Sequence, residues 1–218
     1  MLKRKYWYLT LLFFIACKSP DKVEVDEGKD YYPIAIGHVW VYDIQEVNQT
    51  ILGTDTISYQ VKEEITEIIS SINNETTYKV IISTRQDPND NWTTTTTSLL
   101  VDHRDYLVIK QNNTPIEKLH FPLADNSTWD GNRWNNLGEQ TFEVININTA
   151  DTVGDMAYSQ TMKVEELNDV NLITSEIRYS NYARKTGLIY YYYEDLETQP
   201  GEATQGSTYT KTLVSFTK

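Results

Sequence analysis

Short segments rich in β-branched and aromatic residues recur from residue 39 to the end of the chain, separated by Gly, Pro, Asn and Asp. Such residues fit a pleated, half-buried surface, and frequent turn signals between them are typical of an antiparallel all-β fold. The pattern predicts about eleven strands and few or no helices. Open twisted sheets rarely exceed ~10 strands, so we expect a single strongly curved sheet or a half-open barrel. The predicted strands cover residues 39–47, 57–69, 78–82, 92–101, 106–110, 116–121, 142–148, 161–167, 171–179, 188–196 and 208–216.

One of these segments fits two secondary structures. Residues 61–70 carry apolar side chains at spacings that suit either a helix or a strand. We predict a strand, because Asn73 and Asn74 can form a hairpin turn into the next one, and asparagine tolerates a left-handed backbone. The run Thr93–Thr97 is β-branched but polar, which predicts an exposed or edge strand.

An eight-residue pattern occurs twice. Residues 33–40 and 122–129 share Pro-[Ile/Leu]-Ala-x-[Gly/Asn]-x-x-Trp. The pattern is compatible with a duplicated half-domain or with one loop geometry used twice. The flanking residues do not align, which favours the second interpretation. The second copy opens residues 122–138, which we predict to be the longest loop.

The charge balance limits the partners of the chain. It contains 19 Lys and Arg against 31 Asp and Glu, a formal net charge of −12. Nucleic acid is excluded as a partner, because phosphate binding needs a basic surface. An acidic chain is also repelled by anionic lipid, so any membrane attachment must come from another feature.

The N-terminus suggests such a feature. Three basic residues precede the apolar run 6–16, which is shorter than the ~20 residues of a transmembrane helix and has the pattern of a signal peptide. The run ends at Cys17, the single cysteine of the chain. Residues 14–17 resemble the lipobox of bacterial lipoproteins, with Phe14 where a leucine-like residue is usual. The resemblance implies cleavage before Cys17 and a lipid anchor of fatty acyl chains, such as palmitate, on this residue. The alternative is an ordinary secretory signal with an incidental cysteine.

The expected organisation follows. Residues 1–16 are a signal peptide, residues 17–30 a flexible polar tether, and residues 31–218 a single antiparallel β-domain. Acidic residues soon after Cys17 resemble the surface-export signals of Bacteroidota lipoproteins. We expect a protein of the cell envelope, held at the outer membrane, and leave the leaflet open.

Three motifs of spaced glycine, proline and aromatic residues carry a wider resemblance. They are Tyr32-Pro33-x3-Gly37-x2-Trp40-x-Tyr42, then Phe121-Pro122-Leu123 with Trp129-Asp130-Gly131-Asn132, then Tyr182-Ala183-x3-Gly187-Leu188-Ile189-Tyr190. Together they are similar to a family of uncharacterised Bacteroidota lipoproteins, many of which have glycine in place of Asn126. The resemblance implies a curved antiparallel sheet, comparable to the half-barrel of lipoprotein-carrier proteins, and no catalytic residues.

Motifs for catalysis, metals and cofactors are missing from the sequence. The three histidines have no partner at metal or triad spacing, and no nucleophile elbow, phosphate loop or zinc-protease helix occurs. Asp87-x-Asn89-x-Asn91 begins like a calcium loop but has Trp92 at the glycine position and Ser98 at the twelfth. Glu63–Glu64 and Glu165–Glu166 are adjacent, so their side chains should point to opposite faces of a strand. We therefore predict no catalytic residue, no metal site, no cofactor and no enzyme.

Aromatic residues are the best candidates for ligand contacts. In the run 190–193, Tyr191 and Tyr193 share one face of the strand and their neighbours share the other. A tyrosine combines a flat apolar face with a hydroxyl group, which suits a hydrophobic or glycan ligand. We name Trp129, Trp134, Tyr191 and Tyr193 as candidate ligand contacts, with cross-strand packing as the alternative role.

Two further residues are candidates for modification. Thr56 and Thr152 follow aspartate and precede an aliphatic residue, a pattern that resembles Bacteroidota O-glycosylation sites. The sequence as a whole suggests a lipid-anchored envelope protein that binds a hydrophobic or glycan ligand or another envelope protein. The alternatives are a purely structural lipoprotein without a pocket and a hydrolase.

Overall fold

The computed structural model describes residues 26–218. The predicted signal peptide, Cys17 and most of the predicted tether lie outside this range. The described residues form the short 3₁₀ helix η1 (Lys29–Tyr31) and a single antiparallel sheet of 12 strands. The strands are β1 (Val39–Thr50), β2 (Gly53–Ile72), β3 (Glu75–Arg85), β4 (Thr93–His103), β5 (Tyr106–Gln111), β6 (Thr114–His120), β7 (Thr128–Asp130), β8 (Thr141–Val153), β9 (Met156–Val170), β10 (Thr174–Ala183), β11 (Gly187–Glu197) and β12 (Gln205–Thr217).

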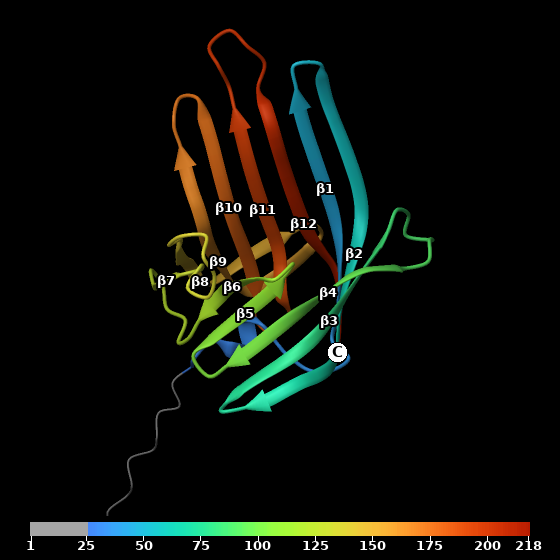
Figure 1. Ribbon diagram of the computed structural model, residues 1–218, viewed down its shortest axis with the longest axis vertical. Coiled ribbons are helices and arrows are strands. Elements are labelled where there is room, and N and C mark those ends of the chain that lie inside the picture. The colour runs from blue at the N-terminus through green and yellow to red at the C-terminus, as the bar shows by residue number, and fades with distance from the viewer. Residues whose placement is uncertain (1–25) are drawn as a thin grey trace, which may run out of the picture.

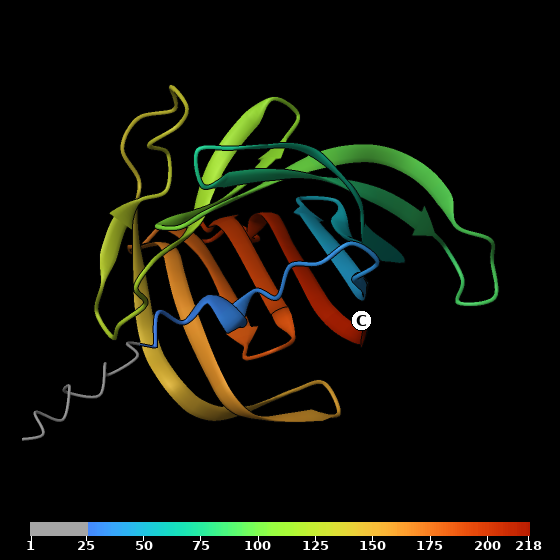
Figure 2. The same cartoon turned by 90° about the horizontal axis from the view of Figure 1, so that it is seen from below.

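The sheet follows the chain and nearly closes on itself. Its order is β6-β5-β4-β3-β2-β1-β12-β11-β10-β9-β8-β7, so two six-stranded halves join through β1 and β12. The sheet curls until its two edges, β6 and β7, lie together (Figures 1 and 2). The amide of Glu117 on β6 donates to the carbonyl of Gly131 just after β7, 2.9 Å away. The prediction of a strongly curved, half-open barrel is thus confirmed.

Most hairpin signals are also confirmed. Asn73 and Asn74 have φ values of +53° and +64°, and Asn112 and Asn113 have +50° and +64°, as two-residue hairpin loops of the I′ type require. Residues 61–70 lie within strand β2, so the strand interpretation was right.

The threonine run is an edge, as predicted. β5 pairs only with residues 99–102 of β4, so Thr93–Thr97 pair with β3 alone. Four of these five threonines are exposed. The β-branched carbons keep the strand extended, and the hydroxyls of Thr94 and Thr95 also contact Ser83 and the Ile82 carbonyl of β3.

Three local predictions differ from the structure. β7 lies inside the predicted loop 122–138, because a three-residue strand is too short to show alternation. Residues 171–173, predicted in a strand, form the turn between β9 and β10. The first hairpin turns at residues 51–52, so residues 48–50 and 53–56, which were not predicted in strands, belong to β1 and β2.

The repeated eight-residue pattern makes the same turn twice. His38 N–H donates to the Ala35 carbonyl at 3.2 Å, and Ser127 N–H donates to the Ala124 carbonyl at 3.1 Å. In each copy the residue before the donor has a positive φ, +90° at Gly37 and +62° at Asn126. Each turn also exchanges a pair of backbone hydrogen bonds with a buried aliphatic residue on the strand that pairs with the one it opens, Ile65 on β2 and Val144 on β8. The two copies therefore share one loop geometry, and each opens one half of the sheet.

Residues 26–38 close the lower end of the barrel (Figure 2). Tyr31 of η1 is fully buried and Tyr32 is 9% exposed. The guanidinium of Arg184 binds the carboxylates of Asp26 and Asp30, each at 2.5 Å. Residues 26–30, predicted in the tether, are therefore packed against the domain. Composition alone cannot show this, because the cation that pairs with these acids comes from the distant β10–β11 turn.

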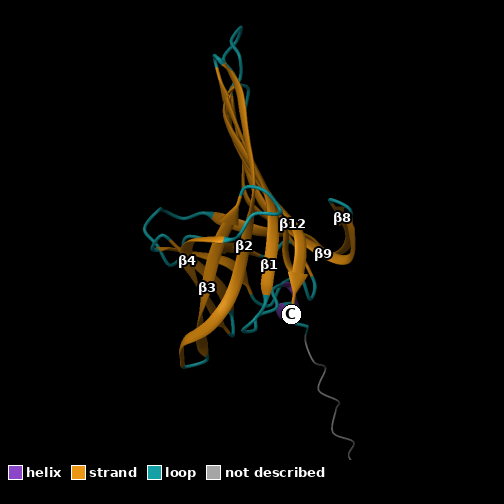
Figure 3. Cartoon of the chain, turned by 90° about the vertical axis from the view of Figure 1, so that its right-hand side faces the viewer, coloured by secondary structure: helices purple, strands orange, loops and turns teal. Residues whose placement is uncertain are grey.

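Strands β1, β2 and β9–β12 continue beyond the barrel as a thin layer (Figures 1 and 3). We call this layer the blade; it comprises residues 45–58, 167–178 and 193–209. Its hairpin tips carry exposed aliphatic side chains, among them Leu52 and Leu172. The described chain begins at the opposite end of the molecule. Within residues 26–218 no helix has the length and apolar character needed to cross a bilayer.

Candidate ligand-binding site

A cavity of about 490 Å³ lies inside the barrel. Its two walls differ in chemistry, because they come from opposite halves of the curled sheet. Strands β3–β6 contribute an aliphatic wall, and β10–β12 contribute tyrosine and lysine side chains. The aliphatic wall consists of Val80, Ile82, Leu100, Ile109 and Ile116, and the facing wall includes Tyr182, Leu188, Tyr191, Tyr209 and Lys211.

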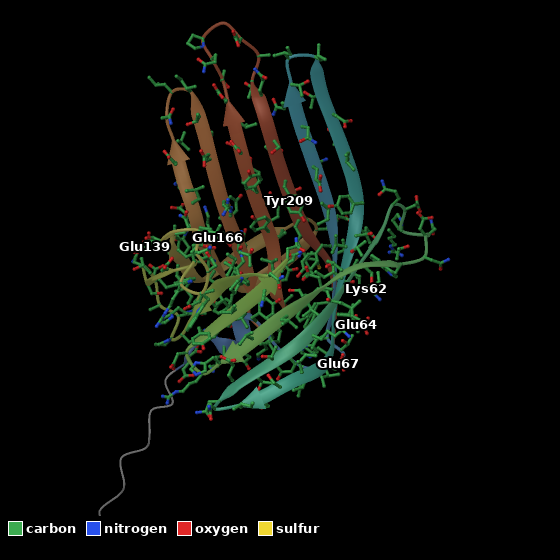
Figure 4. All side chains as sticks on the ribbon, in the orientation of Figure 1. Lys62, Glu64, Glu67, Glu139, Glu166 and Tyr209 are labelled. Atoms are coloured by element: carbon green, nitrogen blue, oxygen red, sulfur yellow. The ribbon has the colours of Figure 1, made fainter. Side chains whose placement is uncertain are left out.

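The cavity opens beside the β5–β6 turn. Gln111, Asn112 and Thr114 of this turn line its rim. Tyr191 and Tyr209 also line a second hollow of about 410 Å³ on the blade, so the cavity continues upward as a groove. Tyr209 lies on β12 where the blade leaves the barrel (Figure 4).

Three phenol hydroxyls of the cavity lack a protein partner. Within the described chain, the side-chain hydroxyls of Tyr32, Tyr191 and Tyr209 form no hydrogen bond, although the ring of Tyr32 is more than nine-tenths buried. Burial raises the pKa of all three phenols above the usual value of 10. Each is therefore a neutral group near pH 7, able to donate a hydrogen bond to a ligand.

Two ion pairs lie in the interior. Lys211 Nζ lies 2.5 Å from Glu63 Oε1, and Lys118 Nζ lies 2.9 and 3.1 Å from the two oxygens of Glu166. Glu166 is 1% exposed and also accepts a hydrogen bond from the Ser180 hydroxyl at 2.7 Å. The ammonium of Lys211 further lies 4.2 Å from the centre of the Tyr42 ring. The positive and negative charges balance, so the cavity does not select strongly for either sign.

The tyrosine run is divided between two environments, as its alternation predicts. Tyr191 lines the cavity and Tyr193 lines the groove. On the other face, Tyr190 and Tyr192 each pack against Tyr179, and burial raises the pKa of Tyr190 to about 12. Whether Tyr191 and Tyr193 contact a ligand stays a prediction.

The two candidate tryptophans lie elsewhere. Trp129 is 8% exposed, packs against Phe142, and donates its indole N–H to the Glu117 carbonyl at 2.8 Å. Trp134 is half-exposed on the loop after β7 and donates to Glu117 Oε2 at 2.6 Å. Neither lines the cavity, and whether either contacts a ligand stays a prediction. Both donate to Glu117 of β6, Trp129 from β7 and Trp134 from the loop that follows, so they cover the β6–β7 seam.

Glu117 is the residue that sequence reasoning missed. Its carboxylate is fully buried and also binds Nδ1 of His120 at 2.7 Å. The only available signal was a charged residue at an ordinary strand position, which gives no hint of burial. A buried carboxylate with a histidine can orient an imidazole for proton transfer. In the described chain, however, the His120 ring has Glu117 as its single hydrogen-bond partner, and no nucleophile is placed against it.

The other candidate groups do not converge on the cavity. His38 Nδ1 lies 3.2 Å from the Pro33 carbonyl oxygen, and His103 stacks on Tyr106. Asp87 accepts hydrogen bonds from the backbone and side-chain N–H groups of Asn89, which lower the pKa of its carboxyl, so the calcium-like segment forms a turn. Among residues 26–218, no three His, Cys, Asp or Glu side chains converge as a metal site.

The candidate glycosylation sites are both accessible. Thr56 lies on β2 and Thr152 on β8, and both side chains are exposed. Exposure is required for modification but does not demonstrate it, so O-glycosylation stays a prediction.

No family model matches the chain, and no curated protein matches its sequence. Two solved structures are similar in fold. One is a protein from Bacteroides fragilis NCTC 9343, named as exported and as having a YmcC-like fold, with a TM-score of 0.49, 10% identity, and coverage of 86% of this chain and 98% of that chain. The other is a protein from Parabacteroides distasonis ATCC 8503, named as a lipoprotein, with a TM-score of 0.44, 10% identity and the same coverage. Function has to be inferred from the cavity and its surroundings.

Proposed function

We propose that this chain is a lipid-anchored envelope protein whose barrel binds a small amphipathic molecule, with the apolar part of the ligand inside the cavity. The observation that carries the proposal is the hollow interior, with one aliphatic wall and one wall of tyrosine hydroxyls. A volume of about 490 Å³ falls within the range of roughly 300–1,000 Å³ that is usual for small-molecule sites.

The cavity argues against a purely structural role. Protein interiors pack densely and contain few voids larger than a water molecule, because each void forfeits dispersion contacts. A barrel selected for rigidity alone would be expected to fill its centre with side chains. Here the polar tyrosine, lysine and glutamate groups instead surround a space that remains open.

The hydrolase alternative receives no specific support. None of His38, His103 and His120 lines the cavity. The carboxylate of Glu63, which does line it, and the buried carboxylate of Glu166 are each bound by a lysine. A carboxylate bound to an ammonium is a poor general base, because the ion pair stabilises its charged form.

The envelope part of the proposal rests on Cys17 and the preceding signal-like segment. Stable anchoring needs more than one acyl chain, which a lipidated cysteine supplies. The described chain starts below the barrel, so the blade would face away from the anchored end (Figure 1). Metabolic labelling with palmitate that persists in a Cys17→Ser variant would contradict the anchor.

Ligand binding is tested by filling the cavity. We expect native mass spectrometry of the full-length protein, purified from its host envelope, to detect a co-purified amphiphile. Ile109→Trp places an indole in the cavity and should abolish this adduct. Leu137→Trp, at a side chain that is 67% exposed on the outer loop, is the matched control and should retain it. An adduct that survives Ile109→Trp in a folded protein, or no adduct in any sample, would overturn the proposal.

A further inference from the structure

The groove above the cavity presents one ordered row of side chains. Arg178 lies opposite Tyr193, Tyr193 opposite Tyr209, and Tyr209 opposite Glu46. Directly opposed residues of antiparallel strands point to the same face, so these four cross β10, β11, β12 and β1 on one side of the blade. We call them the tyrosine row. Because Tyr209 also lines the cavity, the row begins where the cavity opens.

The tyrosine row combines two kinds of contact. The rings of Tyr193 and Tyr209 offer flat faces whose π electrons attract the weakly positive C–H groups of a saturated ring. Arg178 supplies several N–H donors, and the Glu46 carboxylate supplies acceptors. Asn48 and Ser207, also in the groove, add further polar groups. Hydrogen-bonding groups beside aromatic faces suit a ring that carries many hydroxyls.

The surrounding charges disfavour an ionic headgroup. The next row along the blade places Asp169, Glu176, Asp195 and Asp55 on the same face, and all four carboxylates are exposed. They would repel a phosphate or carboxylate head. The guanidinium of Arg178 lies 5.4 Å from the centre of the Tyr193 ring, so it already occupies the position over this ring that a cationic head would take. An uncharged, hydroxyl-rich head avoids both costs.

We propose that the tyrosine row binds an uncharged sugar headgroup, so that the ligand is a glycolipid-like amphiphile with its alkyl chain in the cavity and its sugar on the blade. This inference rests on the proposed function, since the chain must occupy the cavity for the head to reach the row. The blade then has a role of its own, because a closed barrel without it would hold only the apolar part of such a molecule.

The inference is tested with three probes that share one alkyl chain. Decyl maltoside, decanoate and decyltrimethylammonium carry a sugar, an anionic and a cationic head. Each is titrated below its micelle concentration into the full-length protein in lipid nanodiscs, with empty nanodiscs subtracted. We expect decyl maltoside to bind tightest. Tyr193→Ala should weaken decyl maltoside binding about five- to tenfold and leave the other two probes unchanged, because the substitution removes the ring on which the sugar stacks.

The adjacent Tyr192 supplies a matched control. It lies on the opposite face of β11, where its hydroxyl binds Glu194, so Tyr192→Ala should leave all three affinities unchanged. Equal binding of the three probes, or tighter binding of an ionic one, would overturn the sugar assignment while leaving the cavity proposal intact. Failure of all three probes to bind would overturn both proposals. Equal effects of Tyr192→Ala and Tyr193→Ala on decyl maltoside would show that the weakening is structural and would also overturn the assignment.

Discussion

At the scale of single residues, the interior holds charges only where each has a partner. Glu166 is almost completely buried and is satisfied by Lys118 and Ser180. Its neighbour Glu165 points outward, as alternation along the strand predicts, and contacts Asn168 at the surface. Two adjacent and chemically identical side chains therefore have very different roles. Their environments, rather than their type, determine what a substitution costs.

We expect Glu166→Gln to destabilise the fold by about 3–5 kcal/mol, because it leaves the Lys118 ammonium without its counter-charge. The double variant Lys118→Met with Glu166→Leu should recover most of this stability, since neither charge then remains inside. Urea unfolding followed by tryptophan fluorescence measures both. Glu165→Gln is the control and should change stability by less than about 0.5 kcal/mol. A cost for Glu166→Gln as small as that of the control would contradict the buried ion pair.

At the scale of elements, backbone pairing is unevenly distributed around the barrel. Ten of the eleven neighbouring strand pairs share ladders of four or more residues, whereas the two edges, β6 and β7, share no ladder in the described chain. Glu117 instead joins them. Its amide binds Gly131, its carbonyl binds Trp129, and its carboxylate binds Trp134 and His120. The seam is thus closed largely by one side chain and its backbone.

We expect Glu117→Gln to loosen this seam selectively. The neutral amide keeps only one acceptor oxygen, so the charge-assisted hydrogen bonds that the carboxylate forms with Trp134 and His120 are weakened, at a cost of about 1–3 kcal/mol. Hydrogen exchange should accelerate in β6 and β7 and stay unchanged in β1 and β12. Glu139→Gln, on the exposed loop beyond the seam, is the control (Figure 4). Faster exchange spread evenly over the whole sheet would show that Glu117 does not act locally.

At the scale of the whole molecule, tyrosine burial links stability to alkaline pH. Burial raises the pKa of the deeply placed phenols of Tyr42 and Tyr182 well above 10, and the same holds for the cavity tyrosines. Below pH 10 these phenols are protonated in both the folded and unfolded states, so they add no pH dependence. Above that pH the unfolded state loses protons first. The free energy of unfolding must therefore fall as pH rises from about 10 toward the folded-state values.

The expected outcome is a two-stage alkaline titration. Phenolate absorbance should rise first for the exposed tyrosines, and the remainder should appear only together with the disappearance of the β-sheet circular dichroism signal. In guanidinium chloride all tyrosines should titrate together near pH 10. Complete and reversible titration of every phenol with an unchanged dichroism spectrum would contradict the buried tyrosine network.

The sequence determined the local structure, because its signals act over a few residues. Alternating β-branched and aromatic positions specify strands, and paired asparagines with positive φ specify hairpin turns such as Asn73–Asn74 and Asn112–Asn113. The separation of Tyr191 and Tyr193 from Tyr190 and Tyr192 follows from the two-residue repeat of a strand. These features were all predictable without knowledge of the fold.

Only the tertiary structure decided where the sheet closes, that a cavity remains inside the barrel, and that residues 26–30 pack against the domain. Each depends on residues far apart in sequence, such as Lys211 with Glu63, Arg184 with Asp26, and Lys118 with Glu166. Hydrophobic periodicity cannot predict these long-range contacts, because they depend on the accumulated twist and curvature of twelve strands. The same curvature sets the distance between the two walls of the cavity and so leaves a space of about 490 Å³ between them.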